Sequence, residues 1–188
     1  MTAAVRLRPF RPDDVDFLFD LAIDPVVLAG VVGTGRPPTR EQHEAWFASK
    51  DDDRTLRLLV EDALGRPLGV TGLWGIDRRA GTAEVGIKLG GRPEARGRGH
   101  GTSAVHALTS LAFGQLGLRD LRAEVLSTNA ASTALFERRC GWQRRGDRPQ
   151  VALRDGRPVQ VATFGTIMDR SQGHPGHPGH PGGEAALQ

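Results

Sequence analysis

Arg96-Gly97-Arg98-Gly99-His100-Gly101 is the stretch that decides how this chain folds, and it lies between an apolar run ending at Leu89 and a helical pattern. Its three glycines alternate with basic residues, so the backbone can approach a ligand without interference from a Cβ atom. A helix that begins here points its free N–H groups and the positive end of its dipole into the loop. The stretch therefore predicts an anion site suited to a phosphate or pyrophosphate.

The spacing of the glycines chooses among phosphate-binding loops. A Walker-type P-loop is excluded because no Gly-Lys-Ser/Thr follows. Residues 99–104 fit the dinucleotide pattern G-x-G-x-x-A, but that pattern needs a strand that ends directly at the first glycine. Here residues 91–96 are polar and contain Pro93, which predicts an intervening loop. A dinucleotide-binding oxidoreductase therefore stays an alternative, which titration with NADH would test.

Composition bounds the class of protein. The 188 residues suit one domain, and 38% hydrophobic with 25% charged residues is ordinary for a globular protein. One cysteine excludes an internal disulfide framework, and no run approaches the roughly 20 apolar residues of a membrane span. Residues 1–6 lack the apolar core of a signal peptide, so a cytoplasmic protein is expected. The net charge of +3, without a basic block, predicts neither a nucleic-acid nor a membrane partner.

The first half of the chain predicts helices followed by a meander of strands. We expect a strand at 5–10, a helix from 12 to Asp24-Pro25, an irregular linker at 30–38, a helix from the N-cap Thr39 to about 50, and strands at 55–61, 67–76 and 80–89. In the middle strand, Leu68, Val70, Trp74 and Ile76 are expected on one face. In the third strand, Glu84, Gly86 and Lys88 lie opposite the apolar face of Ala83, Val85, Ile87 and Leu89, and Gly86 suggests a bulge.

The second half predicts a crossover, since a helix links the strand at 82–89 to one at 121–126, so these strands should be parallel. Asn129 is a natural N-cap for a helix to about Cys140, with Gly141 after it, and strands are expected at 142–146, 151–153 and 159–168. We expect a domain over 1–170. Residues 171–188 form a His-Pro-Gly-rich tail predicted to be disordered, whose histidines could capture a metal.

Two motifs, about 30 residues apart, resemble those of the GNAT (GCN5-related N-acetyltransferase) superfamily. One is the glycine stretch, read as Arg-x-x-Gly-x-Gly, and the other is residues 129–142, which are similar to N-x-x-S-x-x-L-Y-E-x-x-G-F. The resemblance covers about residues 4–169 and implies an α/β (α+β) fold whose mostly antiparallel sheet has one parallel pair splayed around acyl-CoA. Residues 7–10, 83–86 and 155–157 favour a branch similar to RimJ/RimL-type ribosomal-protein N-terminal acetyltransferases, which also contains enzymes acting on antibiotics and small amines.

The resemblance implies acetyl-CoA as co-substrate, with direct attack of an amine on the thioester and no metal required. The cofactor-binding residues that it implies are Ile87, Leu89, Arg96, Gly97, Arg98, Gly99, His100, Gly101, Thr102, Asn129, Ser132 and Phe136. The loop amides would hold the pyrophosphate, the backbone near Ile87 and Leu89 would pair with pantetheine, and Asn129 and Ser132 would lie beside the thiol. Because the enzyme needs no nucleophile, the lone Cys140 is expected to be a core residue.

The chemistry still needs a base and an acid. Glu84 is the candidate base, and its alternative reading is a solvent-facing carboxylate that pairs with an arginine. The family often has a tyrosine at the position of Phe136, and this chain has no tyrosine, so Ser132 becomes the expected proton donor to the thiolate. Further candidates are His43, His100 and His106, and the His100 ring is expected to face solvent.

The acceptor is less well specified. We expect residues 25–38 and the helix after Thr39 to wall the substrate side, with Trp46, Trp74 and the acidic residues 51–53 as candidate contacts. The expected function is transfer of an acetyl group to a primary amine of a small molecule or a protein N-terminus. The alternative is a non-catalytic acyl-CoA sensor or partner module on the same fold, and a homodimer is left open.

Overall fold

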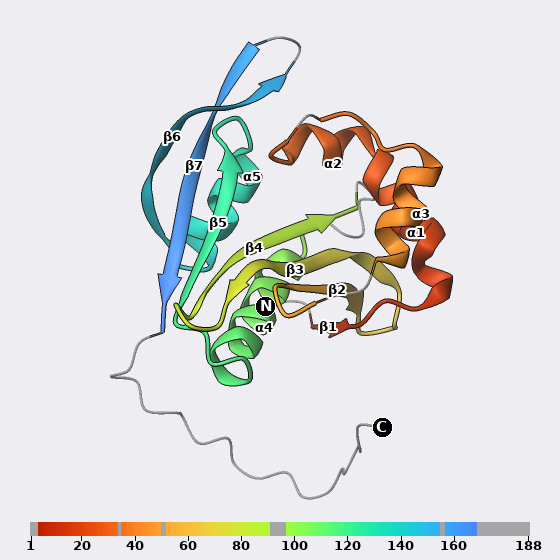
Figure 1. The fold of residues 1–188 in the computed structure, drawn as a ribbon, viewed down its shortest axis with the longest axis horizontal. Helices are drawn as coiled ribbons and strands as arrows, with labels where there is room; N and C mark the ends of the chain where they lie inside the picture. The colour runs from red at the N-terminus through yellow and green to blue at the C-terminus, as the bar shows by residue number, and fades with distance from the viewer. Residues whose placement is uncertain (1–3, 34, 50–51, 91–96, 155–156, 169–188) are drawn as a thin grey trace, which may run out of the picture.

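The computed structural model describes residues 4–33, 35–49, 52–90, 97–154 and 157–168, and the side chains of 148–154 and 157 also lie outside the description. Seven strands form one sheet in the order β1-β2-β3-β4-β5-β7-β6 (Figure 1). Their bounds are β1 Val5–Arg8, β2 Thr55–Asp62, β3 Pro67–Asp77, β4 Thr82–Leu89, β5 Asp120–Leu126, β6 Gln143–Arg154 and β7 Arg157–Ile167. β4 and β5 run parallel and the other neighbouring strands run antiparallel, which confirms the expected fold class.

Helices cover both faces of this sheet (Figure 1). The 3-10 turn η1 (Pro12–Asp14) leads into α1 (Val15–Ile23), followed by α2 (Pro25–Gly30) and α3 (Arg40–Ala48). Leu18, Leu21 and Val27 from α1 and α2 pack on Leu59 and Val70 of the sheet. On the other face lie α4 (His100–Gly114), the short α5 (Ala130–Thr133) and the π-helix η3 (Ala134–Arg139). In the described part of the chain, no helix is both long and apolar enough to cross a membrane.

Local sequence signals explain the helix starts. The Thr39 hydroxyl accepts from the Gln42 backbone N–H while the Gln42 side chain accepts from the Thr39 N–H, so the predicted N-cap of α3 is confirmed as a capping box. Helix α2 was not predicted: the sequence indicated only the end of the first helix at Asp24-Pro25 and an irregular linker at 30–38. The Asp24 carboxylate accepts from the Val26 and Val27 N–H groups and Pro25 occupies the first turn, which together start a helix at 25.

The predicted face of the middle strand β3 is wrong at both of its ends. The register shifts near Glu61 and again between Trp74 and Asp77, where Gly75 has a φ of 57°. Each irregularity turns the neighbouring side chain to the other side of the sheet. Leu68 and Ile76 therefore pack in clusters with residues of α4, whereas Val70 packs with α1.

Gly86 is also not the bulge that was expected, since it pairs in regular register with Gly72 of β3. A Cβ atom at Gly86 would lie 2.8 Å from the indole of Trp74, and one at Gly72 would lie 3.0 Å from the same ring. The two glycines thus leave space for the Trp74 indole against the sheet. Gly86, which was predicted to form a bulge, instead makes room for an aromatic side chain.

The parallel strands β4 and β5 pair over only part of their length and then separate, and the point where they separate is called the fork. Their parallel pairing covers Thr82–Glu84 of β4 and Asp120–Arg122 of β5. Beyond Glu84 the two strands are no longer paired with each other, and Figure 1 shows them diverging toward α2 and α5. The expected splayed parallel pair is thereby confirmed, and it leaves one edge of residues 85–89 without a strand partner among the described residues.

The C-terminal strands are longer than predicted. β6 is one strand from Gln143 to Arg154 with register shifts at Arg144/Gly146 and Arg148/Ala152, where two separate strands were expected. β6 stays one continuous strand because it pairs with β7 on both sides of each register shift. Residues 155–156 and the tail, and with the tail the predicted domain boundary at 170, lie outside the described residues.

Candidate active site

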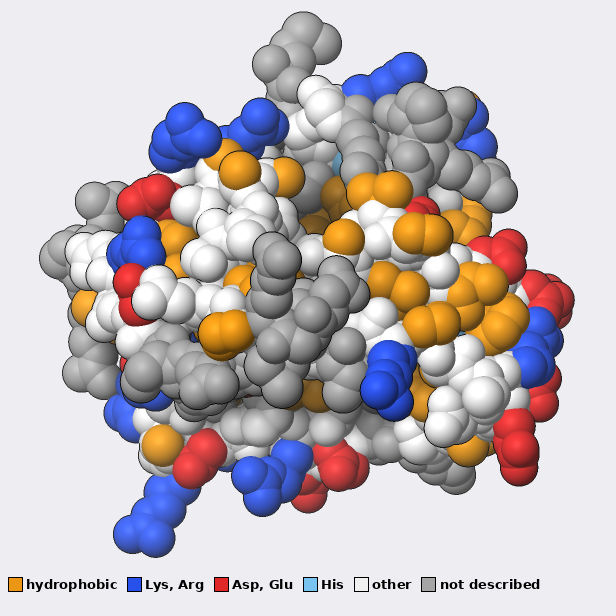
Figure 2. Space-filling view, turned by 90° about the horizontal axis from the view of Figure 1, so that it is seen from above, with side chains coloured by type: hydrophobic (Ala, Val, Ile, Leu, Met, Phe, Trp, Pro, Cys, Tyr) orange, Lys and Arg blue, Asp and Glu red, His pale blue; other side chains and the backbone are white. Residues whose placement is uncertain are grey.

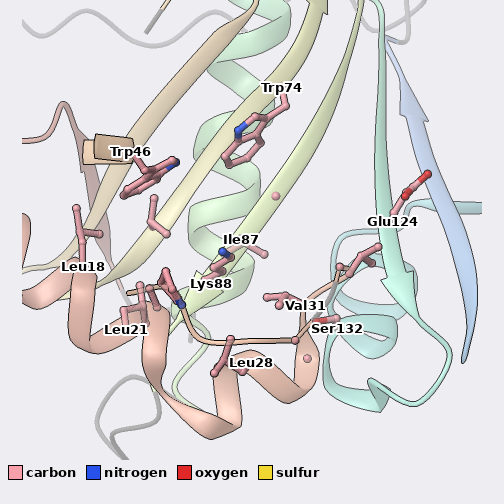
Figure 3. Close-up of a pocket in the computed structure, with 18 of the residues that line it drawn as sticks. Leu18, Leu21, Leu28, Val31, Trp46, Trp74, Ile87, Lys88, Glu124 and Ser132 are labelled. Carbon is pink, nitrogen blue, oxygen red and sulfur yellow. The ribbon is translucent and has the colours of Figure 1, made fainter. Parts of the chain in front are cut away.

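A cavity of about 590 Å³ opens at the fork between β4 and β5. Strand residues Trp74, Glu84, Gly86, Ile87 and Lys88 line one side of it. Figure 3 shows Leu18, Leu21, Leu28 and Val31 approaching from the helices, while Glu124 and Ser132 come from the far side of the fork. The cavity therefore lies between the helical layer of α1 and α2 and the open edge of the sheet.

The helical wall of this cavity is mostly apolar. It is built from α1, α2, residues 31–38 and α3, as the sequence led us to expect for residues 25–38 and the second helix. Trp46 of α3 and Trp74 of β3 both line the cavity, and Figure 3 shows the two indoles on the same side of the opening. From above, hydrophobic side chains gather over the middle and right of the molecule while most charged ones lie along its outline (Figure 2). The cavity is suited to an acceptor with an apolar portion.

Charged side chains of both signs meet this apolar wall. Glu84 is exposed, and as the last β4 residue paired with β5 it lies at the start of the fork. Glu124 of β5 and Arg36 line the same cavity. Lys88 reaches it from β4, and although the residue is accessible to solvent, desolvation inside the cavity lowers the pKa of its ammonium group.

A second cavity, of about 660 Å³, lies at the N-terminus of α4. The helix begins at His100 after Gly99, whose φ of 83° is a left-handed conformation that favours glycine, and Gly97 has a φ of 72°. The first N–H groups of a helix lack helical partners, so this turn offers unpaired donors and the positive end of a 15-residue dipole. Gly97, Gly99, Gly101 and Thr102 line the cavity, whereas Arg96 falls outside the described residues.

The prediction that the His100 ring faces solvent is wrong. His100 is only 7% exposed, and its Nδ1 has no hydrogen-bond partner within the described part of the chain. As the first residue of α4 it lines the second cavity. The sequence could not reveal this, because the loop conformation at Gly97 and Gly99 decides which way the next side chain points.

Asn129 and Ser132 lie where the two cavities meet. The Asn129 Oδ1 accepts from the Ser132 backbone N–H at 3.0 Å, and its Nδ2 donates to the Gly30 carbonyl at 2.9 Å, so one side chain caps α5 and bridges to α2. Ser132 lines both cavities, as do Ile87 and Lys88. Phe136 lines the first cavity from η3 and is 3% exposed, with its ring 4.9 Å from that of Trp142.

The remaining candidate residues are His43, His106 and Cys140. His43 lines the first cavity from α3, but it is buried: its Nε2 is 3.0 Å from the Val15 carbonyl oxygen, and it packs between Phe19 and Trp46. His106 is exposed on α4. Burial raises the pKa of the Cys140 thiol to about 11, which keeps it protonated at neutral pH, as expected for a core residue.

The acidic run 51–53 contributes no described residue to either cavity: Asp52 and Asp53 are exposed and line neither, and Asp51 is not described.

Sequence reasoning did not name Lys88 or Glu124 as site residues. The alternation of β4 already placed Lys88 on the face of Glu84, which was a usable signal. Nothing in the sequence showed that Leu18, Leu21 and Val31 would cover that face, because this depends on how α1 and α2 dock on the sheet.

Comparison with known proteins places the fold. A family model described as an acetyltransferase (GNAT) domain matches residues 4–143. The fold is similar to that of a spermidine N-acetyltransferase from Vibrio cholerae in complex with CoA and spermine, with a TM-score of 0.79 and 21% identity over 87% of this chain and 95% of that chain. It is also similar to a putative phosphinothricin N-acetyltransferase, with a TM-score of 0.72 and 24% identity over 89% of this chain and 100% of that chain. A search of curated proteins gives no match.

Proposed function

This chain belongs to the acetyltransferase (GNAT) domain family and is an N-acetyltransferase, and from that premise we propose that it transfers an acetyl group from acetyl-CoA to a primary amine. The acceptor is a small molecule or a protein N-terminus. The amine attacks the thioester carbonyl directly, its proton leaves to a base, and CoA departs as a thiolate that takes up a proton.

The observation that carries this proposal is the continuity of two cavities across the β4–β5 fork. The second cavity lies at the α4 N-terminus, where unpaired amides suit a pyrophosphate. The open edge of β4 at Ile87 and Leu89 offers backbone groups to the pantetheine amides. The first cavity then receives the acyl group, since Ile87, Lys88 and Ser132 line both spaces.

We assign the remaining implied cofactor contacts to the same path. Gly97, Gly99, His100, Gly101 and Thr102 line the second cavity, and we assign them to the phosphate loop together with Arg96 and Arg98 on the sequence motif. Asn129, Ser132 and Phe136 are assigned to the thiol end. Glu84 is the proposed base because it lies at the fork and lines the acceptor cavity. Ser132 is the proposed proton donor to the thiolate, in place of the tyrosine that Phe136 replaces.

The choice of acceptor is open between two readings. The sequence features at 7–10 and 83–86 favour the RimJ/RimL-like branch, whose acceptors include protein N-termini. The structural relatives are described as acting on spermidine and, putatively, phosphinothricin, both amine-bearing small molecules. The apolar wall that α1 and α2 form beside the first cavity favours a small-molecule amine.

Binding of acetyl-CoA to the full chain by calorimetry, beside CoA and NADH, tests the cofactor half. The informative variants are Gly101→Asp and Gly101→Ala. A Cβ atom at Gly101 meets its nearest neighbours, side-chain atoms of Leu135 and Leu89, at 3.5 Å, which is ordinary contact, so the Cβ atom common to both substitutions fits. A carboxylate in the first turn also suits the helix dipole, so Gly101→Asp should fold, yet it places like charge on the pyrophosphate.

We expect micromolar binding of acetyl-CoA and CoA, none of NADH, and a loss of at least about 100-fold in affinity for Gly101→Asp but not for Gly101→Ala. Equal affinities in the two variants would contradict the assignment of the phosphate loop. Tight acetyl-CoA binding without thiol release across a broad amine panel would favour the sensor alternative.

A further inference from the structure

Lys88 is one of the charged groups lining the cavity that the reaction outlined above does not use. It lies on β4 between Ile87 and Leu89, which turn to the opposite side of the sheet and pack in a cluster with Ala104 of α4. Lys88 instead leaves the sheet on the face of Val70 and Trp74, and it enters the acceptor cavity opposite Leu28 and Val31 (Figure 3). Lys88 borders the second cavity as well, and its side chain lies on the face of the sheet that carries the acceptor cavity.

The ammonium group of Lys88 has no counter-ion among the described residues. Within the described residues Lys88 makes no ion pair, and the only cause acting on its pKa is desolvation, which lowers it. The residue is nevertheless exposed, so its ammonium group is open to a ligand that supplies the anion. Such a side chain in an open cavity is a recognition group for an anion.

The opposite end of the same face carries a carboxylate. Glu84 and Lys88 are four residues apart on one face of β4, so their Cα atoms are roughly 13 Å apart along the strand. Both line the acceptor cavity, with Gly86 between them and the Trp74 indole over Gly86. Along β4 the cavity lining thus carries a negative charge at Glu84, at the fork where the amine must react, and a positive charge at Lys88.

We propose that the acceptor is a zwitterionic amine, an amino acid or a related amino acid analogue, whose anionic group is bound by Lys88 while its amine lies at the fork beside Glu84. This inference rests on the acetyl transfer proposed above and names its substrate class. The apolar wall of Leu18, Leu21, Leu28 and Val31 accommodates the apolar part of such a molecule. A polyamine is disfavoured, because its second ammonium would lie against Lys88.

The test compares acceptors that differ only in the anionic group. Initial rates of thiol release by the full chain with acetyl-CoA are measured for the L-amino acids, for the same amino acids as carboxamides, and for spermidine. We expect the best amino acid to have a kcat/KM about 10- to 100-fold above that of its carboxamide and above that of spermidine. A preference for carboxamides or for spermidine overturns the proposal.

The variants Lys88→Met and Lys88→Arg identify the residue responsible. Lys88→Met retains the length of the side chain without its charge, so it should remove the preference for the amino acid over its carboxamide, through the KM of the amino acid. Lys88→Arg should keep the preference. An equal loss for both acceptors, or weakened acetyl-CoA binding in Lys88→Met, would place Lys88 on the cofactor and overturn the proposal.

Failure of the proposed function is recognised separately. If acetyl-CoA binds but no amine is acetylated, calorimetry of the amino acids with the CoA-saturated protein still reads out the site. Amino-acid binding that disappears in Lys88→Met supports the zwitterion site without turnover. No amino-acid binding by the unmodified protein overturns it.

Discussion

At the scale of single residues, the proposed chemistry assigns a role to each of two side chains at the fork. Glu84 is the last residue of β4 that pairs with β5, so its position is set by the sheet on both sides. Ser132 is held by the cap of α5, since its own N–H bonds to Asn129. Both side chains line the acceptor cavity, and the backbone of rigid elements positions both of them.

Substitution of these two residues is expected to slow the chemical step rather than to weaken cofactor binding. Glu84→Gln removes the proposed base and should lower kcat by about 100-fold at pH 7, and Ser132→Ala should lower it by about tenfold because water can replace the hydroxyl. Steady-state kinetics with acetyl-CoA and the best amine measures both. The matched control is Glu124→Gln, a carboxylate in the same cavity; a larger loss of kcat there would transfer the role of base to Glu124.

At the scale of elements, α2 and α5 are linked across the cavities by one side chain. Asn129 caps α5 and donates to the last carbonyl of α2, 99 residues earlier in the chain. A Cβ atom on Gly30 would lie 2.7 Å from the Asn129 amide nitrogen, so the two elements approach closely there. The side-chain wall of the acceptor cavity is therefore coupled to the helix that carries Ser132.

We expect Asn129→Ala to lower the free energy of unfolding by about 2 kcal/mol, through loss of a cap and of a part-buried hydrogen bond. It should also raise the KM of the amine, because α2 loses its link to α5. Urea unfolding and steady-state kinetics measure the two effects. The control is Thr39→Ala, which removes only the cap of α3 and should cost about 1 kcal/mol. Equal costs for the two variants would mean that the bridge to Gly30 contributes no stability.

At the scale of the whole molecule, a buried ionic network ties the N-terminal strand to the sheet and to η1. Arg8 donates to Asp14 at 2.7 Å and to Glu61 at 2.5 Å, and Arg6 also donates to Glu61, whose exposed fraction is 2%. Burial raises the pKa of Glu61, but the hydrogen bonds from Arg6 and Arg8 outweigh it and leave the pKa below its usual 4.5. The hydrogen bond from Arg8 likewise lowers the pKa of Asp14 below 3.8.

These shifts predict the sign of acid unfolding. Because both pKa values are lowered in the folded state, the unfolded chain binds protons first as the pH falls through their usual values. The stabilisation is therefore complete above about pH 5 and is lost as the pH falls through the lowered, folded-state values. Glu61→Gln should lower the free energy of unfolding by about 3 kcal/mol at pH 7 and flatten its dependence below pH 5.

Urea unfolding followed by tryptophan fluorescence, at a series of pH values from about 7 down to 3, measures both effects. The conservative Glu61→Asp shortens the side chain but keeps the charge, so it should retain the slope even where it lowers stability. An unchanged slope in Glu61→Gln would show that this network does not govern acid unfolding.

The sequence by itself determined the features that depend on neighbours along the chain. The capping pair Thr39 and Gln42, the cap Asn129 and the left-handed Gly99 lie within one turn of the helices that they start, so local hydrogen bonding and backbone sterics suffice. The crossover between β4 and β5 also follows from the order of elements, because a helix connecting neighbouring strands makes them parallel. The glycine turn before α4 and the fork were therefore predictable.

Only the tertiary structure decided what fills and faces the site. Gly86 leaves space for the Trp74 indole, and the His100 ring is buried. Lys88 lines the acceptor cavity. Each depends on residues distant in sequence, through strand register, loop conformation or the docking of α1 and α2 on the sheet. Side-chain environments of this kind are set by packing between elements, and an alternating pattern gives only the face on which a residue lies.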